Sequence, residues 1–280
     1  CGVGMPEYVL PPLRIPLVDP LIASQGYSFA RAKRCEIERA LAWADVVHLE
    51  EPFYLQAVVA RYARRRGVPV VATYHIHPEN LTASVYLDRV VPLNRAILEL
   101  WKRAIFNRSD LVQCPSRSVC ERVSKLRVRA PLLLLSNGVP LGEGVCADGR
   151  EVGESGVVRV LVVGRYSREK DQATILRALR HSAHARSIQL TFAGRGPTEH
   201  SLRASARRLL RRGVIAHPVR FAFMSADELA REASSCDLYV HAARIEVEGL
   251  SALEVLRHGV VPVIARGPLT ATSQFALSED

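Results

Sequence analysis

The side chains most able to do chemistry lie in residues 245–256, IEVEGLSALEVL, where three glutamates surround a single glycine. A helix is predicted to begin just after Gly249. The first turn of a helix leaves N–H groups unpaired and carries partial positive charge, and a glycine there lets a phosphate approach the backbone. The amides of Gly249, Leu250 and Ser251 are therefore candidates to bind a diphosphate.

A second interpretation of the same residues is purely structural. Ser251 and Glu254 have the spacing of a capping box, in which their side chains satisfy N–H groups at the start of their own helix. This interpretation explains neither Glu246 nor Gly249, and neither interpretation explains Glu248. Both stay open at this point.

The loop in VLVVGRYSREKD (residues 160–171) supplies cations that suit a pyrophosphate. A buried strand is predicted to end at Gly164, and Arg165 and Lys170 follow it. Only four of the 38 basic residues are lysines, so a lysine in this loop is informative. The alternative is a surface loop with ordinary charges. Gly194, in LTFAGRGP (residues 190–197), marks a similar turn that either approaches a ligand or simply joins a strand to a helix.

TYHIHPEN (residues 73–80) places two histidines after another predicted strand. His75 and His77 fit metal ligands, an acid/base pair or plain loop residues. No third ligand accompanies them and the sequence has no DxD motif, so no metal site is expected. His75, at the carboxyl end of a strand, is the candidate catalytic residue of this region. Glu79 and Asn80 are predicted to begin a helix and to cap it.

Short apolar runs alternate with longer amphipathic stretches from Asp45 onward, a pattern that predicts βαβ units and parallel sheets. The predicted strands are residues 45–49, 68–75, 111–114, 131–135, 157–164, 187–194, 219–223, 237–241 and 260–264. The predicted helices are residues 55–67, 92–107, 198–212, 225–235 and 251–258, with two more that begin near 116 and 171. In such sheets, ligands bind at the carboxyl ends of the strands. We therefore expect an α/β fold of two doubly wound, Rossmann-like domains facing a cleft, at residues 1–140 and 157–280, joined by a linker at 141–156.

The composition is that of a globular protein, since 48% of the 280 residues are apolar and 24% are charged. No apolar run approaches the length of a membrane span. The six cysteines are scattered, which favours a reduced, cytoplasmic protein. The first residue is Cys1 and no leader-like pattern follows it, so we expect no signal peptide and a chain that begins within a longer protein.

The chain is basic, with a net charge of +10 and clusters at RYARRRG (residues 61–67) and RRLLRRG (residues 207–213). Such clusters fit solvated helix ends, an anionic membrane surface or a nucleic acid. Aromatic residues make up 6% of the chain and do not alternate with the basic runs, and no zinc-finger or RNA-binding motif occurs. No nucleic-acid partner is therefore expected, whereas a peripheral contact with an anionic membrane stays open.

These motifs together resemble glycosyltransferase family 4, which has the GT-B fold. Glu246 and Glu254 are separated by seven residues, with Gly249 between them. They follow three other motifs in the family's order, SNGVP (136–140), GRYSREK (164–170) and AGRGP (193–197). The similarity extends over roughly residues 45–280. YHIHPEN and FNRSDLVQCPS (106–116) are similar to bacterial members grouped with lipid- or polyprenol-linked sugar transferases.

The resemblance implies a hexosyltransferase that moves a hexose, with retention of configuration, from a nucleotide-diphosphate sugar donor. It implies a lipid- or polyprenol-linked or cell-envelope glycan acceptor at the inner face of the cytoplasmic membrane, and neither a metal nor another cofactor. The residues that it assigns to the donor are Arg165, Lys170, Gly194, Gly249, Leu250, Ser251 and, on the ribose, Glu254. It places Glu246 beside the transferred sugar and His75 close to the reacting centre.

An alternative is a non-catalytic GT-B protein that binds partners, or an inactive fragment. The family's first strand with its glycine-rich loop is expected before residue 1, so the N-terminal domain is expected to be incomplete. The family's final helices are expected after residue 280.

Overall fold

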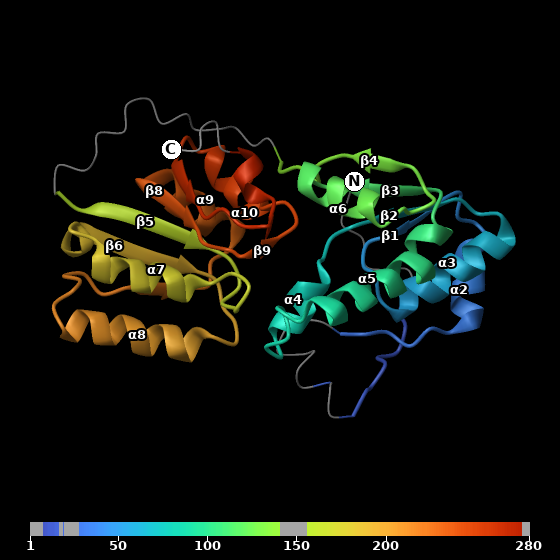
Figure 1. Cartoon of the computed structure of the whole chain (residues 1–280), viewed down its shortest axis with the longest axis horizontal. Coiled ribbons are helices and arrows are strands. Elements are labelled where there is room, and N and C mark those ends of the chain that lie inside the picture. The colour runs from blue at the N-terminus through green and yellow to red at the C-terminus, as the bar shows by residue number, and fades with distance from the viewer. Residues whose placement is uncertain (1–7, 17–18, 20–27, 141–155, 276–280) are drawn as a thin grey trace. The chain divides into compact units, whose positions relative to one another are not determined.

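The computed structural model in Figure 1 describes residues 8–16, 19, 28–140 and 156–275. The chain divides into two compact units, Cys1–Ser136 and Asn137–Asp280, named here the N-terminal unit and the C-terminal unit. Residues 141–155, nearly all of the predicted linker, lie outside the described residues. Each unit is built on its own parallel sheet, which confirms the predicted α/β class.

The N-terminal unit contains a four-stranded parallel sheet in the order β1-β2-β3-β4. Its strands are β1 (Val47–Leu49), β2 (Val70–Thr73), β3 (Leu111–Cys114) and β4 (Leu132–Leu134). Its helical elements are α2 (Arg34–Leu41), α3 (Tyr54–Arg66), α4 (Pro78–Ala83), α5 (Val91–Ala104), the short η1 (Phe106–Arg108) and α6 (Arg117–Lys125). Because all four strands run the same way, the loops that follow β1, β2 and β3 emerge at one edge of the sheet.

Local sequence explains where the helices of this unit lie. Helix α3 ends at Gly67, whose φ of 73° is the left-handed conformation that glycine adopts most readily. Helix α5 buries Asn94, Leu98 and Trp101, which recur every three or four residues and form its inner face. In strand β2, every residue except Val71 is buried, as expected for a strand covered on both faces.

The C-terminal unit contains a five-stranded parallel sheet in the order β10-β8-β5-β6-β7 and a two-stranded parallel pair, β9 with β11. Its strands are β5 (Val158–Val163), β6 (Ile188–Ala193), β7 (Arg220–Ala222), β8 (Leu238–His241), β9 (Ile245–Glu246), β10 (Val261–Ile264) and β11 (Leu269–Thr270). Its helical elements are α7 (Gln172–Ala178), η2 (Leu179–His181), η3 (Ala185–Ser187), α8 (Glu199–Arg211), α9 (Ala226–Ser235), α10 (Leu250–Leu256) and η4 (Thr272–Phe275). The chain builds β5, β6 and β7 in one direction, then crosses back to place β8 and β10 on the other side of β5. This reversal between β5 and β8 is the topological switch point at which doubly wound folds bind ligands.

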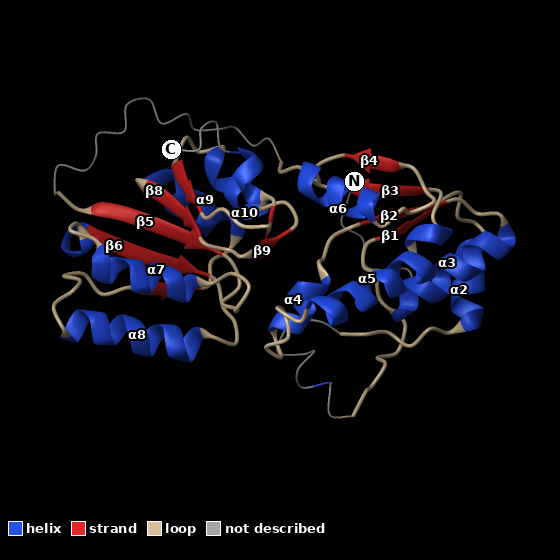
Figure 2. Cartoon of the chain, in the orientation of Figure 1, coloured by secondary structure: helices blue, strands red, loops and turns tan. Residues whose placement is uncertain are grey.

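Alternate residues of β5 pack on opposite faces of the sheet. Val160 and Val162 belong to a cluster that includes Leu202 of α8, on the face covered by α7 and α8 (Figure 2). Leu161 belongs to a second cluster with Val255 of α10, on the face covered by α9 and α10. Apolar layers therefore bury both faces of the sheet at its centre. The loops after β5 and β8 emerge from the edge formed by the carboxyl ends of these strands.

The predicted strands and helices are all present, with ends that differ by a few residues. The sequence pattern misses α2, β9 and β11. Strands β9 and β11 each contain two residues, which is too few to show the alternation by which strands are recognised.

Candidate active site

The loops that follow β5 and β8 meet at the switch point of the C-terminal sheet. The loop after β5 carries Arg165 and Lys170, and the loop after β8 leads through β9 to Glu246. The two loops are joined by a backbone hydrogen bond in which the N–H of Arg244 donates to the carbonyl of Glu169 at 2.8 Å. Motifs that are 76 residues apart in the sequence are therefore neighbours.

Lys170 and Glu246 form the central contact of this site, in which Nζ of Lys170 donates a hydrogen bond to Oε2 of Glu246. Both side chains are mostly buried. Burial by itself would raise the pKa of Glu246, but the charge of Lys170 and the hydrogen bonds from His241 and Lys170 outweigh it and lower the pKa to about 2. Glu246 is therefore a carboxylate at neutral pH, fixed beside a cation.

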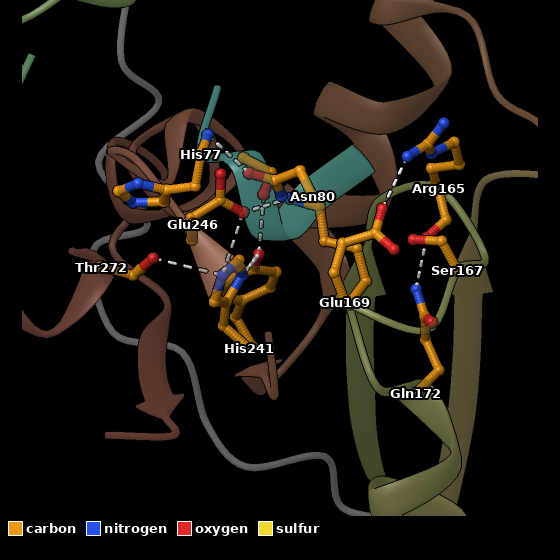
Figure 3. A network of polar contacts seen from close by, with 12 residues as sticks. His77, Asn80, Arg165, Ser167, Glu169, Gln172, His241, Glu246 and Thr272 are labelled. Carbon is orange, nitrogen blue, oxygen red and sulfur yellow. Dashed lines mark hydrogen bonds and ion pairs between the residues drawn. The ribbon is translucent and has the colours of Figure 1, made fainter. Parts of the chain in front are cut away.

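A buried chain of polar contacts runs from Glu246 to the start of α10. Figure 3 shows its first part, at Glu246, His241 and Thr272. Nε2 of His241 lies 3.6 Å from Oε2 of Glu246 and 3.2 Å from Oγ1 of Thr272. Nδ1 of His241 lies 2.9 Å from the hydroxyl of Tyr239, and that hydroxyl lies 3.1 Å from Oγ of Ser251. His241, Tyr239 and Thr272 are all buried, so the chain holds the carboxylate and the helix start in a fixed relation.

Neither Tyr239 nor His241 stands out in the sequence, because both lie within the predicted strand DLYVH (residues 237–241). A signal was present, since polar side chains at alternate positions of a buried strand face the same side. Burial raises the pKa of the Tyr239 hydroxyl, which therefore stays protonated and available as a hydrogen-bond donor.

Gly249 begins α10 in the left-handed conformation, with φ 96° and ψ 45°. A Cβ at this position would lie 2.4 Å from Oγ1 of Thr272, so a larger residue does not fit. Packing against Thr272 thus requires a glycine here, independently of any ligand.

The capping-box interpretation of Ser251 and Glu254 is wrong. The N-cap of α10 is Gly249, and no side chain caps this helix. The hydroxyl of Ser251 lies against Tyr239 instead. Glu254 lines a hollow of about 360 Å³ between α9 and α10, together with Leu229 and His258.

Glu248, which has no interpretation from the sequence, anchors the chain where it enters the C-terminal unit. Its carboxylate is 1% exposed and accepts hydrogen bonds from Nδ2 of Asn137 at 2.6 Å and from the N–H of Asn137 at 3.2 Å. Asn137 belongs to the SNGVP motif and is the first residue of the unit. Glu248 therefore has a structural role.

Arg165 is held by a buried carboxylate in its own loop (Figure 3). Nη2 of Arg165 donates to Oε1 of Glu169 at 2.6 Å, and Glu169 is buried. The carbonyl of Arg165 accepts a hydrogen bond from Nε2 of Gln172 at 2.8 Å. Both ends of the residue are thus fixed, which orients its guanidinium group before any ligand binds.

Gly194 lies where two loops of the C-terminal unit pack closely. A Cβ on Gly194 would be 2.1 Å from the carbonyl oxygen of Gly164. This contact explains the glycine by packing, so a role for Gly194 in donor binding stays a prediction.

His75 follows β2 in the N-terminal unit and is paired with a carboxylate. Its Nε2 lies 2.5 Å from Oε2 of Glu50, which follows the neighbouring strand β1. Oε1 of Glu50 lies 3.3 Å from Nδ1 of His48. A carboxylate at one ring nitrogen orients an imidazole, as acid/base histidines require.

His77 and Glu79 have structural roles in the same unit. Nδ1 of His77 lies 3.0 Å from the hydroxyl of Tyr74, and the N–H of His77 donates to Oδ1 of Asn80 at 2.9 Å. Nη2 of Arg122 donates to both carboxylate oxygens of Glu79, at 2.8 and 3.0 Å. Helix α4 is thus capped by His77 and Asn80, and Glu79 forms a buried ion pair instead of a cap.

Glu51, next to the partner of His75, is a further titratable group that sequence analysis misses. In the described part of the chain, its Oε2 has no hydrogen-bond partner. Burial and the adjacent Glu50 raise the pKa of Glu51 to about 7. A carboxyl group that titrates near neutral pH beside a histidine–carboxylate pair is typical of a functional site.

Among residues 28–140 and 156–275 and the few described before them, no group of three or more His, Cys, Asp or Glu residues could hold a metal ion. None of the helices described there has the length and apolar character needed to cross a membrane.

Family models match both halves of the chain. The model for Glycosyltransferase Family 4 matches residues 5–143, and the model for Glycosyl transferases group 1 matches residues 151–273. No curated protein matches the chain in sequence.

Solved glycosyltransferases resemble the chain over different extents. The catalytic domain of cholesterol-alpha-glucosyltransferase from Helicobacter pylori is 38% identical over 44% of this chain and 73% of its own, with a TM-score of 0.37. HepE from Anabaena is 15% identical over 87% of this chain and 66% of its own, with a TM-score of 0.65. The α,α-trehalose-phosphate synthase from Burkholderia xenovorans is 15% identical over 88% of this chain and 66% of its own, with a TM-score of 0.60.

The chain spans about two thirds of the length of HepE and of the synthase. At their level of identity, the likeness shows a shared fold. The two family models account for almost the whole chain, and each unit has the parallel α/β architecture that the GT-B fold requires. The chain therefore belongs to glycosyltransferase family 4 and has the GT-B fold.

Proposed function

We propose that this protein transfers a hexose from a nucleotide-diphosphate sugar to a lipid- or polyprenol-linked or cell-envelope glycan acceptor. The observation that carries the proposal is the Lys170–Glu246 pair at the switch point of the C-terminal sheet. Arg165 lies in the same loop as Lys170, and Gly249 begins a helix just after Glu246. Fixed cations, a fixed carboxylate and helix-start N–H groups suit a departing diphosphate and an electron-poor sugar.

The fold supports a nucleotide-sugar donor. HepE has been solved with UDP and with UDP-glucose, and the trehalose-phosphate synthase is described as UDP-forming. In this chain we assign the donor phosphates to Arg165, Lys170 and the first N–H groups of α10, and the ribose to Glu254. The glycines at 194 and 249 would let the backbone approach the donor.

In the proposed reaction, the bond between C1 of the sugar and the diphosphate breaks, and its electron pair leaves on a phosphate oxygen. Arg165 and Lys170 stabilise that negative charge. Glu246, held as a carboxylate by its low pKa, stabilises the positive charge that develops on the sugar. The acceptor hydroxyl then bonds to C1, and its proton passes to the phosphate oxygen that has left. We assign His75, oriented by Glu50, as the catalytic residue of the N-terminal unit.

Retention of configuration and independence of metal ions are further parts of the proposal. Arg165 and Lys170 supply positive charge of the kind that a divalent ion would otherwise bring to the diphosphate. We therefore expect transfer to continue in excess chelator, and the anomeric proton coupling of the product to match that of the donor sugar in NMR spectra.

The decisive experiment is calorimetric titration of UDP-, GDP- and ADP-sugars into the complete protein. We expect one donor class to bind, and the Arg165→Ala/Lys170→Ala variant to bind it at least about 100-fold more weakly, since charge-assisted contacts to phosphate are strong. The matched control is Arg207→Ala/Arg208→Ala, which removes the same charge from exposed positions of α8 and should bind normally.

The absence of binding to any nucleotide sugar by the parent protein would contradict the proposal. Binding without hydrolysis or transfer would instead favour the non-catalytic alternative. Equal weakening by both double variants would show that the effect comes from net charge and not from the assigned site.

A further inference from the structure

The turn between α4 and α5 exposes a dense group of apolar side chains. Within residues 84–91, named here the apolar turn, five large apolar residues are exposed, namely Val85, Tyr86, Leu87, Val90 and Val91. Tyr86 and Val91 are each 71% exposed. Surface apolar residues are normal when they are scattered, but a contiguous group marks an interaction site.

The apolar turn is held in a strained conformation. Tyr86 has a φ of 65°, in the left-handed region that non-glycine residues rarely occupy. The N–H of Leu87 donates to the carbonyl of Thr82 at 2.8 Å, and the N–H of Tyr86 donates to that of Ala83 at 3.2 Å. Strain of this kind persists only where the surroundings enforce it, and it concentrates at functional positions.

A buried asparagine enforces the shape of the turn from below. Nδ2 of Asn94 donates to the carbonyl of Asp88 at 2.9 Å, and Oδ1 of Asn94 accepts from Oγ1 of Thr82 at 2.8 Å. Asn94 and Thr82 are both buried. The turn is therefore tied to α4 and α5 at its base, so the exposed side chains are presented in a fixed arrangement.

The exposed apolar surface continues along α5. Pro92, Ala96 and Leu100 follow one another at four-residue spacing and are exposed, Leu100 to 62%. Residues four apart lie along one line of a helix, and the buried residues of α5 lie on the opposite side. The turn joins α4 to α5 (Figure 1), so the apolar turn and this line belong to a single helix–turn element.

Cations flank this surface. Arg89 lies within the apolar turn, and Arg95 and Arg103 lie on α5; all three are exposed. Arg89, Arg95 and Arg103 form no ion pair with any residue of the described part of the chain. Apolar side chains that include a tyrosine, with arginines beside them, match the interface of a bilayer, where tyrosine rings lie at the headgroups and arginines meet lipid phosphates.

We propose that the apolar turn and the exposed line of α5 insert into the interface of an anionic phospholipid membrane. The inference rests on the proposed function, because a lipid-linked acceptor would be reached from that surface. Charge complementarity favours this occupant, since a purely apolar protein partner would not require the three arginines.

The first test is co-sedimentation of the complete protein with vesicles. The vesicles are phosphatidylcholine alone, or phosphatidylcholine with about a third phosphatidylglycerol, at low salt. We expect binding to the anionic vesicles, about 30-fold weaker for Arg89→Gln/Arg95→Gln, since each arginine near an anionic surface contributes roughly fivefold. Tyr86→Ser/Val91→Ser should weaken binding by at least about tenfold, because both side chains would lose their apolar contact.

Matched control variants test whether a loss of vesicle binding comes from this surface or from a general change in charge or apolarity. Arg207→Gln/Arg211→Gln removes the same charge from exposed positions of α8, and Val261→Ser removes an exposed apolar side chain from β10. Both variants should bind the vesicles within about twofold of the parent protein. Loss of binding in the α8 variant equal to that of the turn variant would overturn the proposal.

A second test measures whether the side chain at position 86 enters the bilayer. In a Trp43→Phe background, the tryptophan of the Tyr86→Trp variant should emit at shorter wavelength on anionic vesicles. Brominated acyl chains should quench this emission. An unshifted, unquenched tryptophan on bound vesicles would overturn the proposal. So would concentration-dependent self-association that Tyr86→Ser/Val91→Ser abolishes, combined with absence of vesicle binding, since that outcome assigns the surface to a second copy of the chain.

A failure of the membrane proposal can be distinguished from a failure of the proposed function. Donor calorimetry concerns the C-terminal unit and needs no vesicles. A parent protein that binds a nucleotide sugar but no vesicles would refute the surface and leave the proposed reaction intact. The converse result would support the surface and refute the donor assignment.

Discussion

Nε2 of His241 lies 3.6 Å from Oε2 of Glu246, on a ring whose other nitrogen meets the hydroxyl of Tyr239 at 2.9 Å. His241 is buried and contacts Glu246, so we expect it to act on the proposed reaction through Glu246. It is therefore a positioning residue.

Replacing His241 by leucine is expected to lower kcat by about tenfold and to change the donor KM by less than about twofold, because a misplaced carboxylate matters most in the transition state. His241→Gln should restore part of kcat, since the glutamine amide can reach the position of Nε2. Steady-state kinetics with the complete protein gives the comparison. Equal losses in kcat and in donor affinity for both variants would show that the histidine merely supports the fold.

Replacing Lys170 by methionine is expected to raise the pKa of Glu246 from about 2, because burial then acts on the carboxyl without its cation. A depressed pKa stabilises the folded state at pH above the unfolded value, and this stability is lost as the pH falls through the folded value. The parent protein should therefore lose the Glu246 contribution between about pH 4.5 and 2. Carbon-13 NMR of the carboxyl group measures the shift, with the exposed Lys125→Met as the control; an unchanged Glu246 titration would contradict the pairing.

Replacing Gly249 by alanine is expected to destabilise the C-terminal unit by about 2–4 kcal/mol, because the new Cβ would combine left-handed strain with a clash. Its contact is Oγ1 of Thr272 at 2.4 Å. The control is Gly259→Ala, whose φ of 72° is similarly left-handed but whose Cβ would have nothing within 4 Å. That variant should cost about 1 kcal/mol. Urea unfolding followed by circular dichroism gives the free energy of unfolding of both variants. Equal losses would show that Thr272 moves aside without cost.

Replacing Glu248 by glutamine is expected to destabilise the C-terminal unit by about 1–3 kcal/mol. The amide of glutamine would place donors against the two donors of Asn137 that the carboxylate now satisfies. The control is Glu199→Gln, which alters an exposed pair with Arg203 and should cost less than about 0.5 kcal/mol. Hydrogen exchange at Asn137 should also accelerate in Glu248→Gln alone; unchanged exchange would remove the anchoring role.

Replacing Glu51 by glutamine is expected to flatten the pH dependence of the N-terminal unit. A carboxyl whose folded pKa is raised to about 7 contributes stability that is complete below its ordinary value near 4.5 and is lost as the pH rises to 7. After allowance for screening at a half-buried site, the parent should lose about 1–2 kcal/mol across that window. Trp43 and Trp101 are the only tryptophans and both lie in this unit, so their fluorescence reports its unfolding. Identical pH slopes for parent and variant would contradict the raised pKa.

The sequence alone determined most of the helices and strands, all except α2, β9 and β11, because they depend on local patterns. The run VLVV (residues 160–163) in β5 is apolar throughout, as a strand covered on both faces must be. Helix α8 repeats Leu202, Ala206 and Leu209 along one side, which the 3.6-residue period of a helix dictates. The glycosyltransferase family can also be recognised from the sequence, since its motifs combine local turn chemistry with fixed spacing.

Only the tertiary structure decided which side chains meet. The pairing of Lys170 with Glu246 depends on the crossover that places β8 beside β5, and no local pattern encodes a crossover. The role of Glu248 could not be predicted for the same reason, since its partner Asn137 is 111 residues away. His241 likewise meets Thr272, which is 31 residues away. Local spacing even misled at Ser251, because a capping box and a hydrogen bond to Tyr239 need the same residue type. The sequence supplies the chemical groups, and the packing of helices on both faces of the sheet decides which of them are neighbours.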